Sequence, residues 1–289
     1  MKLFDKDIVL QRYRCSGHLQ RLQLSRPFVN LYVRVTDGCN AHCRFCCNEG
    51  NRGCSPFRLD KVIDSIKEIN QSGIRLNRVC LTGGEPGIDV NMVNDIIQAI
   101  DSGHTQLQLN TNGLSADSRR LMKLDRIDVI SVSLHHYQKD KLSEIFGTEV
   151  RDDFASFPGV DRRKLNVSCN LMRGYIDNAD EVKKYLDFVA SKGIRTVGFV
   201  SLMKVNEYCR DKFIDYSEID FGSIPHLLLT RERHHGDNCK CRNYIYRAEN
   251  GMMMEVYMRE NIDPQYCASS LLFDGTYLRQ GFNNNSIIH

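Results

Sequence analysis

The chain has 289 residues, of which 42% are hydrophobic, and its 39 basic and 36 acidic side chains leave a net charge of +3. That charge is too small to indicate a nucleic-acid-binding protein. No apolar run approaches membrane-spanning length and residues 1–14 lack a signal-peptide core, so we expect a cytoplasmic protein. Its 12 cysteines then indicate metal or redox chemistry rather than disulfides.

Between residues 28 and 202, short β-branched segments alternate with amphipathic ones. The predicted strands cover 28–35, 78–81, 106–109, 129–134, 165–172 and 196–202, and the predicted helices cover 59–72, 90–100, 117–124, 138–146 and 179–191. Val62, Ile66 and Ile69 show the helical spacing of apolar residues, and Asp89 is a suitable N-cap. Six successive β/α units predict parallel strands, with the chemistry at their carboxyl ends.

The pattern changes after Met203. Residues 204–238 are polar and mixed, and two hairpins are predicted beyond them, at 244–258 and 269–282, each around a dipeptide that ends in glycine. The sequence therefore predicts three parts, which are an N-terminal extension (1–28), a β/α domain (29–203) and a small cysteine-rich β-hairpin domain (204–289).

Cys39, Cys43 and Cys46 form the most informative motif of the chain. Their spacing places three thiolates directly after the first predicted strand, and composition alone predicts roughly 0.02 such triplets. Four thiolates would complete a [4Fe–4S] cluster, whereas three leave one iron able to bind another ligand. The alternatives are a zinc site or buried core thiols. Zinc ligands usually form two short clusters, and core cysteines would not crowd into a polar loop rich in Gly and Asn.

This Cys-x3-Cys-x-aromatic-Cys spacing, with VCLTGGEPG (79–87) at the end of the next predicted strand, resembles the signature of the radical SAM superfamily. The resemblance implies a partial (β/α)6 TIM-like barrel in which Cys39, Cys43 and Cys46 hold a [4Fe–4S] cluster. The open iron would bind S-adenosylmethionine, whose reductive cleavage yields a 5′-deoxyadenosyl radical that abstracts hydrogen from a substrate. Cys47 lies outside the spacing and is not expected to be a ligand.

The resemblance also implies which residues surround S-adenosylmethionine. Gly83, Gly84 and Glu85 match the turn that holds the methionyl amine by backbone carbonyls and a carboxylate. Phe45 matches the aromatic residue beside the adenine. Three strand-end residues match positions that contact ribose, carboxylate or adenine, although each also fits a packed side chain: Ser133, Asn170 and Met203.

A second group of cysteines brackets the first hairpin. Cys239, Cys241 and Cys267 resemble the ligands of the small twitch or SPASM domains, which hold an auxiliary Fe–S cluster, although those domains usually begin with Cys-x2-Cys rather than Cys-x-Cys. Cys209 is the candidate fourth ligand. The alternatives are His235 as ligand, an iron open to substrate, a zinc site, or ordinary thiols.

Within the superfamily the chain resembles the molybdenum-cofactor GTP cyclases through YVRVTDGCN, LTGGEPG, NTNG, SVSL, KLNVSCNLMRG and VGFVSLM. Lys164 and Thr111 occupy substrate-side positions of that family. Tyr32 and Cys80 stand where those enzymes use arginines for the GTP triphosphate, and the sequence ends without their terminal Gly-Gly. We therefore expect a shared core, a different substrate pocket and no GTP cyclisation.

These resemblances favour an enzyme that modifies a peptide or protein side chain with help from the auxiliary cluster. The alternatives are the same chemistry on a small metabolite or nucleotide, and a non-catalytic Fe–S electron carrier. The expected partners are a reductant, such as flavodoxin or ferredoxin, and the peptide or small-molecule substrate.

Overall fold

The computed structural model describes residues 2–8, 11–13, 23–48, 57–100, 105–232, 241–259, 270–281 and 286–289. Its strands are β1 (Lys2–Leu3), β2 (Lys6–Asp7), β3 (Gln11–Tyr13), β4 (Gln23–Thr36), β5 (Arg75–Gly83), β6 (Gln106–Thr111), β7 (Val129–Ser133), β8 (Leu165–Leu171), β9 (Thr196–Ser201), β10 (Leu227–Glu232), β11 (Arg242–Arg247), β12 (Met253–Arg259), β13 (Ser270–Phe273) and β14 (Leu278–Gln280). Its α-helices are α1 (Leu59–Gln71), α2 (Val90–Ala99), α3 (Ala116–Leu121), α4 (Lys139–Phe146), α5 (Ala179–Ser191) and α6 (Glu207–Lys212). Short 3-10 helices cover Pro86–Ile88, Arg162–Lys164, Tyr216–Glu218 and Phe221–Ser223.

The strands β4 to β9 pair in parallel and in chain order, which confirms the predicted partial (β/α)6 barrel. Each strand and helix predicted between residues 28 and 202 is present, with ends shifted by a few residues. Asp89 caps α2 as predicted, because its carboxylate accepts a hydrogen bond from Met92 N at 3.0 Å. The sequence did not predict α6 or β10, which lie in the segment read as polar and mixed.

Both predicted hairpins form, and they extend the same sheet at opposite edges. β11 and β12 are antiparallel, and β12 pairs in parallel with β9. β13 and β14 are antiparallel, and β13 pairs in parallel with β4. Within the described residues the result is one 12-stranded sheet that ends in β10 on one side and in β14 on the other, while β3 pairs with β4. A separate cysteine-rich domain over residues 204–289 stays a prediction.

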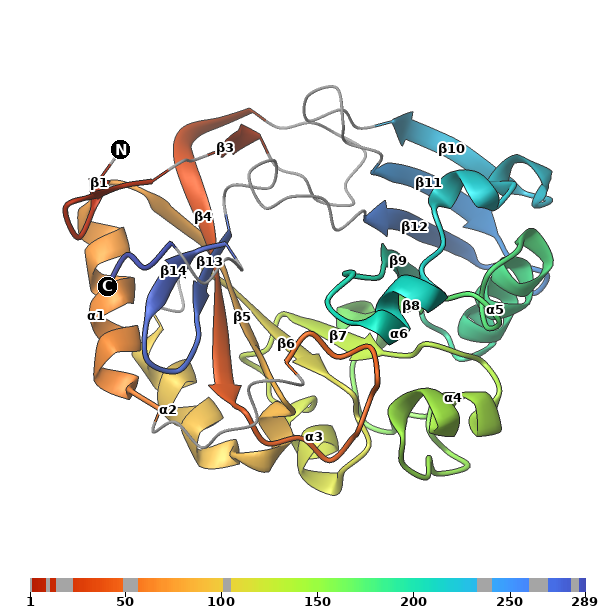
Figure 1. Cartoon of the computed structure of the whole chain (residues 1–289), viewed down its shortest axis with the longest axis horizontal. Coiled ribbons are helices and arrows are strands. Elements are labelled where there is room, and N and C mark those ends of the chain that lie inside the picture. Colours follow the sequence, from red (N-terminus) through yellow and green to blue (C-terminus); the bar gives the residue numbers. More distant parts are fainter. Residues whose placement is uncertain are drawn as a thin grey trace.

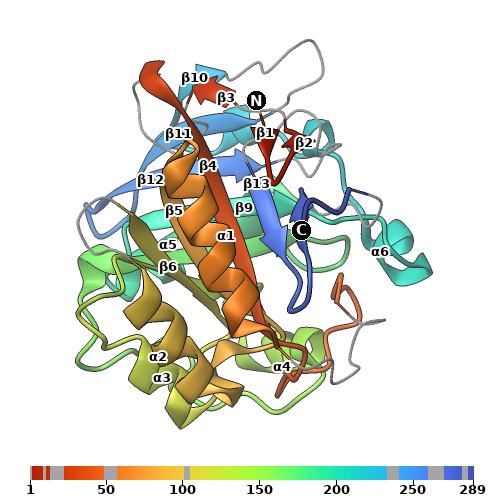
Figure 2. The same ribbon diagram turned by 90° about the vertical axis from the view of Figure 1, so that its left-hand side faces the viewer.

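The sheet curves around a central space, and α1 to α5 cover its outer side (Figures 1 and 2). The apolar side chains of the strands face these helices, so that Val79 of β5 shares one hydrophobic cluster with Val62 and Ile66 of α1. None of the helices in the described part of the chain is long and apolar enough to cross a bilayer.

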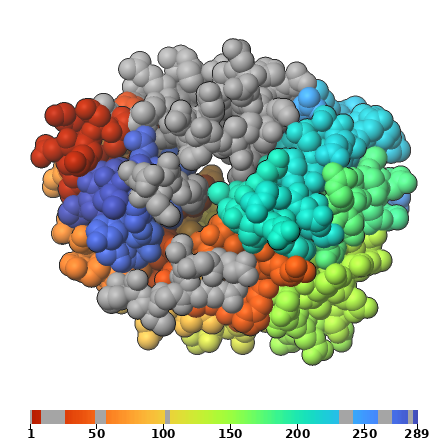
Figure 3. Space-filling model, in the orientation of Figure 1, coloured from red at the N-terminus to blue at the C-terminus, as the bar shows by residue number. Residues whose placement is uncertain are grey.

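The inner side of the sheet is polar. In β6, the buried Leu107 and Leu109 alternate with the half-buried Gln106 and Gln108. β7 and β8 repeat this alternation, and the half-buried polar residues of β4 to β8 include Asn30, Tyr32, Arg78, Asn110, Ser131, Ser133, Asn166, Ser168 and Asn170. Strands of a parallel sheet that is covered on both faces are apolar throughout, so this pattern indicates a hydrated interior. An opening is visible at the centre of the space-filling view (Figure 3).

Gly198 of β9 makes room for a side chain of this interior. It pairs with Tyr257 of β12, and a Cβ on Gly198 would overlap the Tyr257 ring, with the phenol carbon Cζ 2.5 Å away. The ring therefore lies flat across β9, and only glycine leaves space for it.

Replacing Gly198 by alanine is expected to lower the free energy of unfolding by about 1–3 kcal/mol, the usual cost of overpacking. Chemical denaturation of the wild type and the variant measures this loss. In a double-mutant cycle with Tyr257→Ala, the loss should shrink when the ring is absent, and equal losses in both backgrounds would contradict the contact.

Candidate active site

The loops that follow β4 and β5 pack against each other at the carboxyl ends of the strands. Gly84 N donates a hydrogen bond to Thr36 O at 2.7 Å, and Glu85 N donates to Gly38 O at 2.8 Å. Gly83 has a φ of +138°, and a Cβ on it would lie 2.5 Å from Thr36 O. A Cβ on Gly84 would overlap the carbonyl oxygen of Gly38. The two glycines of the GGEP turn are therefore required for the cysteine loop to lie against it.

The cysteine loop suits the [4Fe–4S] cluster implied by its spacing. Its three cluster cysteines are partly exposed. Cys39 Sγ accepts hydrogen bonds from Ala41 N at 3.4 Å and from Asn112 Nδ2 at 3.9 Å, and Cys46 Sγ accepts one from Asn48 N at 3.4 Å. Hydrogen bonds to sulfur stabilise thiolate ligands and influence the reduction potential of a cluster. These residues therefore fit the cofactor.

Glu85 is the buried centre of the turn, with 1% of its surface exposed. Its Oε1 accepts hydrogen bonds from Thr111 Oγ1 at 2.7 Å, Ser118 Oγ at 2.9 Å and Gly87 N at 3.2 Å. Its Oε2 accepts one from Asn112 N at 2.7 Å. Burial raises the pKa of this carboxyl, and the four hydrogen bonds oppose that rise. The carboxylate thus faces protein donors, whereas the family resemblance implied a contact with the methionyl amine.

Two substrate-side residues suggested by the resemblance lie elsewhere. Thr111 is buried and its hydroxyl donates a hydrogen bond to Glu85, so it does not face a substrate. Lys164 lies at the amino-terminal end of β8, where its Nζ donates to Asp125 O at 2.9 Å. Thr111 thus lies at the carboxyl end of its strand with a buried side chain, whereas Lys164 lies at the opposite end of β8 from the cysteine loop.

Three predicted S-adenosylmethionine contacts follow or end neighbouring strands at the same rim. Ser133 is the last residue of β7, Asn170 is the last but one of β8, and Met203 lies two residues beyond β9. Ser133 and Asn170 are half-buried, whereas Met203 is 38% exposed. Their positions are compatible with one ligand site, and their roles stay predictions.

His135 lies beneath this rim, and sequence reasoning assigned it no role. Its ring is 4% exposed and meets the Phe45 ring edge-on, with 4.9 Å between centroids. His135 Nδ1 accepts a hydrogen bond from Asn170 N at 3.1 Å, so the proton of the neutral ring is on Nε2. Burial lowers the pKa of His135 to about 3. A neutral histidine thus supports two of the predicted cofactor contacts.

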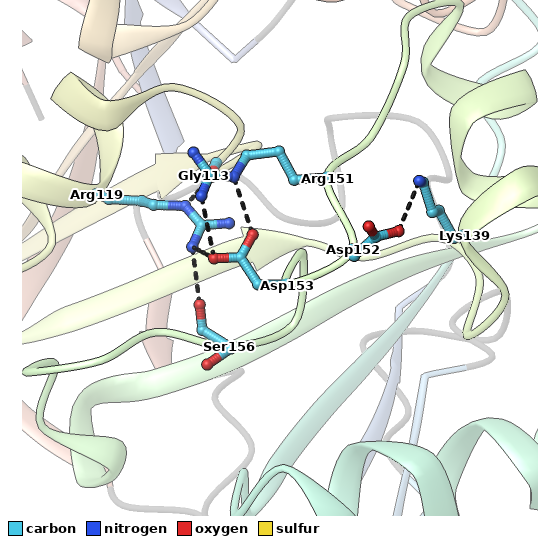
Figure 4. A network of polar contacts seen from close by, with 7 residues as sticks. All are labelled: Gly113, Arg119, Lys139, Arg151, Asp152, Asp153 and Ser156. Carbon is cyan, nitrogen blue, oxygen red and sulfur yellow. Dashed lines mark hydrogen bonds and ion pairs between the residues drawn. The ribbon is translucent and has the colours of Figure 1, made fainter.

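The NTNG turn after β6 is also held from outside the barrel. Arg119 Nε donates to Gly113 O at 3.0 Å, and its Nη1 donates to Ser156 O at 2.9 Å and pairs with Asp153 at 3.3 Å. Arg151 pairs with the same Asp153 at 2.9 Å (Figure 4). These contacts fasten the connection between α4 and β8 to the turn that carries Asn112.

The predicted ligands of the auxiliary cluster are only partly visible. Cys209 of α6 is buried, and its Sγ donates to Phe45 O at 3.6 Å, beside the first cysteine loop. Cys241 is buried next to β11, whereas Cys239 and Cys267 lie outside the described residues. Within the described ranges, no three His, Cys, Asp or Glu side chains are arranged to hold a metal ion. The ligand assignments for both clusters therefore rest on spacing and, at the first, on hydrogen bonds to sulfur.

Replacing His135 by glutamine is expected to weaken the pH dependence of stability. The folded protein keeps this ring neutral down to a pKa of about 3, whereas the unfolded chain binds a proton below about 6.5, so stability falls as the pH drops through this window. The contribution is about 1.4 kcal/mol per pH unit. Urea denaturation from about pH 6 to pH 4 measures it, and parallel curves for both proteins would contradict the buried neutral ring.

Comparisons with known proteins agree with this site. The radical SAM superfamily matches residues 33–189. A protein named probable GTP 3′,8-cyclase from Saccharolobus solfataricus is 27% identical over 259 residues, which cover 85% of this chain and 79% of that protein. A protein of the same name from Metallosphaera sedula is 25% identical over 84% of this chain and 76% of its own length.

The fold has relatives among solved structures. Streptococcus suis SuiB bound to S-adenosylmethionine shares it with a TM-score of 0.50 and 15% identity, over 65% of this chain and 43% of SuiB. Because the superfamily match spans more than half of the sequence and includes the cysteine loop and the GGEP turn, the chain belongs to the radical SAM superfamily and is an enzyme that uses a [4Fe–4S] cluster and S-adenosylmethionine.

Proposed function

We propose that this enzyme abstracts a hydrogen atom from a small anionic molecule held inside the barrel, with a nucleotide as the first candidate. When bound, the cluster and S-adenosylmethionine supply one-electron cleavage of the sulfonium and the 5′-deoxyadenosyl radical that removes hydrogen. The relatives named GTP 3′,8-cyclase favour this alternative over the peptide substrate expected from sequence. A reductant must supply the electron, and we propose a flavodoxin or ferredoxin.

Arg78 carries the proposal. Its Nε and Nη1 donate hydrogen bonds to the side-chain oxygens of Gln106 and Gln108, both at 2.8 Å. Both partners are neutral, and no carboxylate of the described residues forms an ion pair with Arg78. A half-buried guanidinium that is held in place but not neutralised is suited to a carboxylate or phosphate group.

Arg259 supplies a second cation to the same interior. Its guanidinium carbon lies 4.6 Å from the centre of the Tyr257 ring. Burial raises the pKa of Tyr257, and the charges of Arg259 and Arg78 oppose that rise. Both guanidiniums therefore lie within electrostatic reach of one phenol, although β5 and β12 are separated by four strands of the sheet.

The cations differ from those implied for the GTP cyclases. Tyr32 and Cys80, which replace arginines of that family, are neighbours on β4 and β5. Burial raises the pKa of the Cys80 thiol to about 12, so this side chain is neutral. Positive charge is supplied by Arg78 and Arg259 instead, which supports an anionic substrate bound in a different arrangement.

Replacing Arg78 by glutamine should raise the KM for a nucleotide substrate by roughly 10- to 100-fold, the range expected for one charge-assisted contact. The assay measures release of 5′-deoxyadenosine by anaerobically reconstituted protein with dithionite, S-adenosylmethionine and a panel of nucleoside triphosphates that includes GTP. Arg75→Gln, at the exposed start of the same strand, is the matched control and should leave KM unchanged. Stimulation by peptides alone, or equal effects of both substitutions, would refute the proposal.

Iron counting tests the two proposed ligand sets. The variant with Cys39, Cys43 and Cys46 all replaced by alanine should lose the S-adenosylmethionine-binding cluster and keep iron at Cys241 and its predicted partners. Iron and sulfide analysis after anaerobic reconstitution measures both. An iron-free triple variant would show that the chain holds one cluster only.

A further inference from the structure

We infer that Glu85 is a positioning residue and not a ligand of S-adenosylmethionine: its carboxylate fastens the GGEP turn to the NTNG turn and to α3, and the connection continues through Asn112 to Cys39. The inference concerns the cofactor site of the superfamily and does not depend on which substrate the barrel holds.

The carboxylate of Glu85 is buried among protein donors. An ionised carboxylate offers about four lone-pair sites. Four protein donors point at this carboxylate: Thr111 Oγ1, Ser118 Oγ and Gly87 N at Oε1, and Asn112 N at Oε2. With 1% of its surface exposed, the Glu85 carboxylate is enclosed by these donors and is closed to the ammonium group of a ligand.

The donors come from segments that are distant in the chain. Thr111 lies 26 residues and Ser118 33 residues from Glu85. The turn also packs tightly against α3, since a Cβ on Gly87 would lie 2.7 Å from Ser118 N. The carboxylate thus links the GGEP turn to the NTNG turn and to α3.

Asn112 extends the cross-link to the cluster loop. Its backbone N–H is bonded to Glu85, while its Nδ2 donates to Asn40 Oδ1 at 2.7 Å and to Cys39 Sγ at 3.9 Å. If the carboxylate no longer holds the NTNG turn, this amide loses its fixed position beside the sulfur. A weaker hydrogen bond to a ligand sulfur stabilises the reduced cluster less, so the reduction potential falls.

Glu85→Gln in the reconstituted holoenzyme separates the two roles. Glutamine cannot accept all four hydrogen bonds, because one end of its amide is a donor. We expect binding of S-adenosylmethionine and of its analogue without the α-amino group to weaken by the same factor, roughly tenfold. The ratio of the two Kd values then stays at its wild-type value, while the midpoint potential, followed by EPR without S-adenosylmethionine, falls.

Two results would overturn the inference. A Kd ratio that collapses towards one would mean that Glu85 binds the amine, and an unchanged ratio with an unchanged potential would mean that no connection to Cys39 exists. Asp89→Asn is the matched control: this nearby carboxylate caps α2 and accepts no hydrogen bond from the NTNG turn among the described residues, so both readouts should stay constant.

A second variant serves if Glu85→Gln does not fold. Thr111→Val combined with Ser118→Ala removes two donors and keeps the carboxylate. The potential should again fall with the Kd ratio preserved. A folded double variant with the wild-type potential would overturn the inference.

Discussion

The active-site end of this barrel depends on one constraint. The cysteine loop, the GGEP turn and the NTNG turn must lie close together, and the buried carboxylate of Glu85 must still receive its hydrogen bonds. Gly83 and Gly84 permit the approach, because any side chain there would meet the backbone of the cysteine loop. Glu85 then stabilises this close packing, because a buried carboxylate is strongly unfavourable unless its hydrogen-bond donors stay in place. The GGEP turn is therefore an element of the scaffold as much as a cofactor contact.

The same sheet serves two environments. Its outer face is apolar and packs on the helices, whereas the half-buried residues of its inner face are mostly polar. This alternation is costly unless the interior holds water or a polar ligand, because amides such as Gln106 and Gln108 need partners. Both amides accept hydrogen bonds from Arg78 and thereby hold a cation on the inner side of the sheet. In the proposed function, the same side chains thus serve the structure and the recognition of the substrate.

Local chemistry made most of the barrel predictable from sequence. Strand composition, helical periodicity and a cap such as Asp89 act over a few residues, and these signals located the elements between residues 28 and 202. The two C-terminal hairpins were also predicted, but a turn motif indicates only that its two flanking strands pair. It does not indicate which edge of the sheet the hairpin joins. The parallel docking of β12 on β9 depends on Tyr257 crossing Gly198, residues far apart in sequence. The role of Glu85 was missed for the same reason, as its side-chain partners belong to other loops.

The charge distribution constrains how a substrate would lie in the proposed reaction. Around the cofactor turn the chain presents groups that are neutral or internally paired, such as His135 and Glu85. Arg78 lies five residues before Gly83 on the same strand, which corresponds to roughly 16 Å of extended chain. An anionic group held by Arg78 would therefore sit deep in the barrel, with the opposite end of the molecule directed towards the cofactor. The position of one fixed cation thus decides which part of the substrate is exposed to hydrogen abstraction.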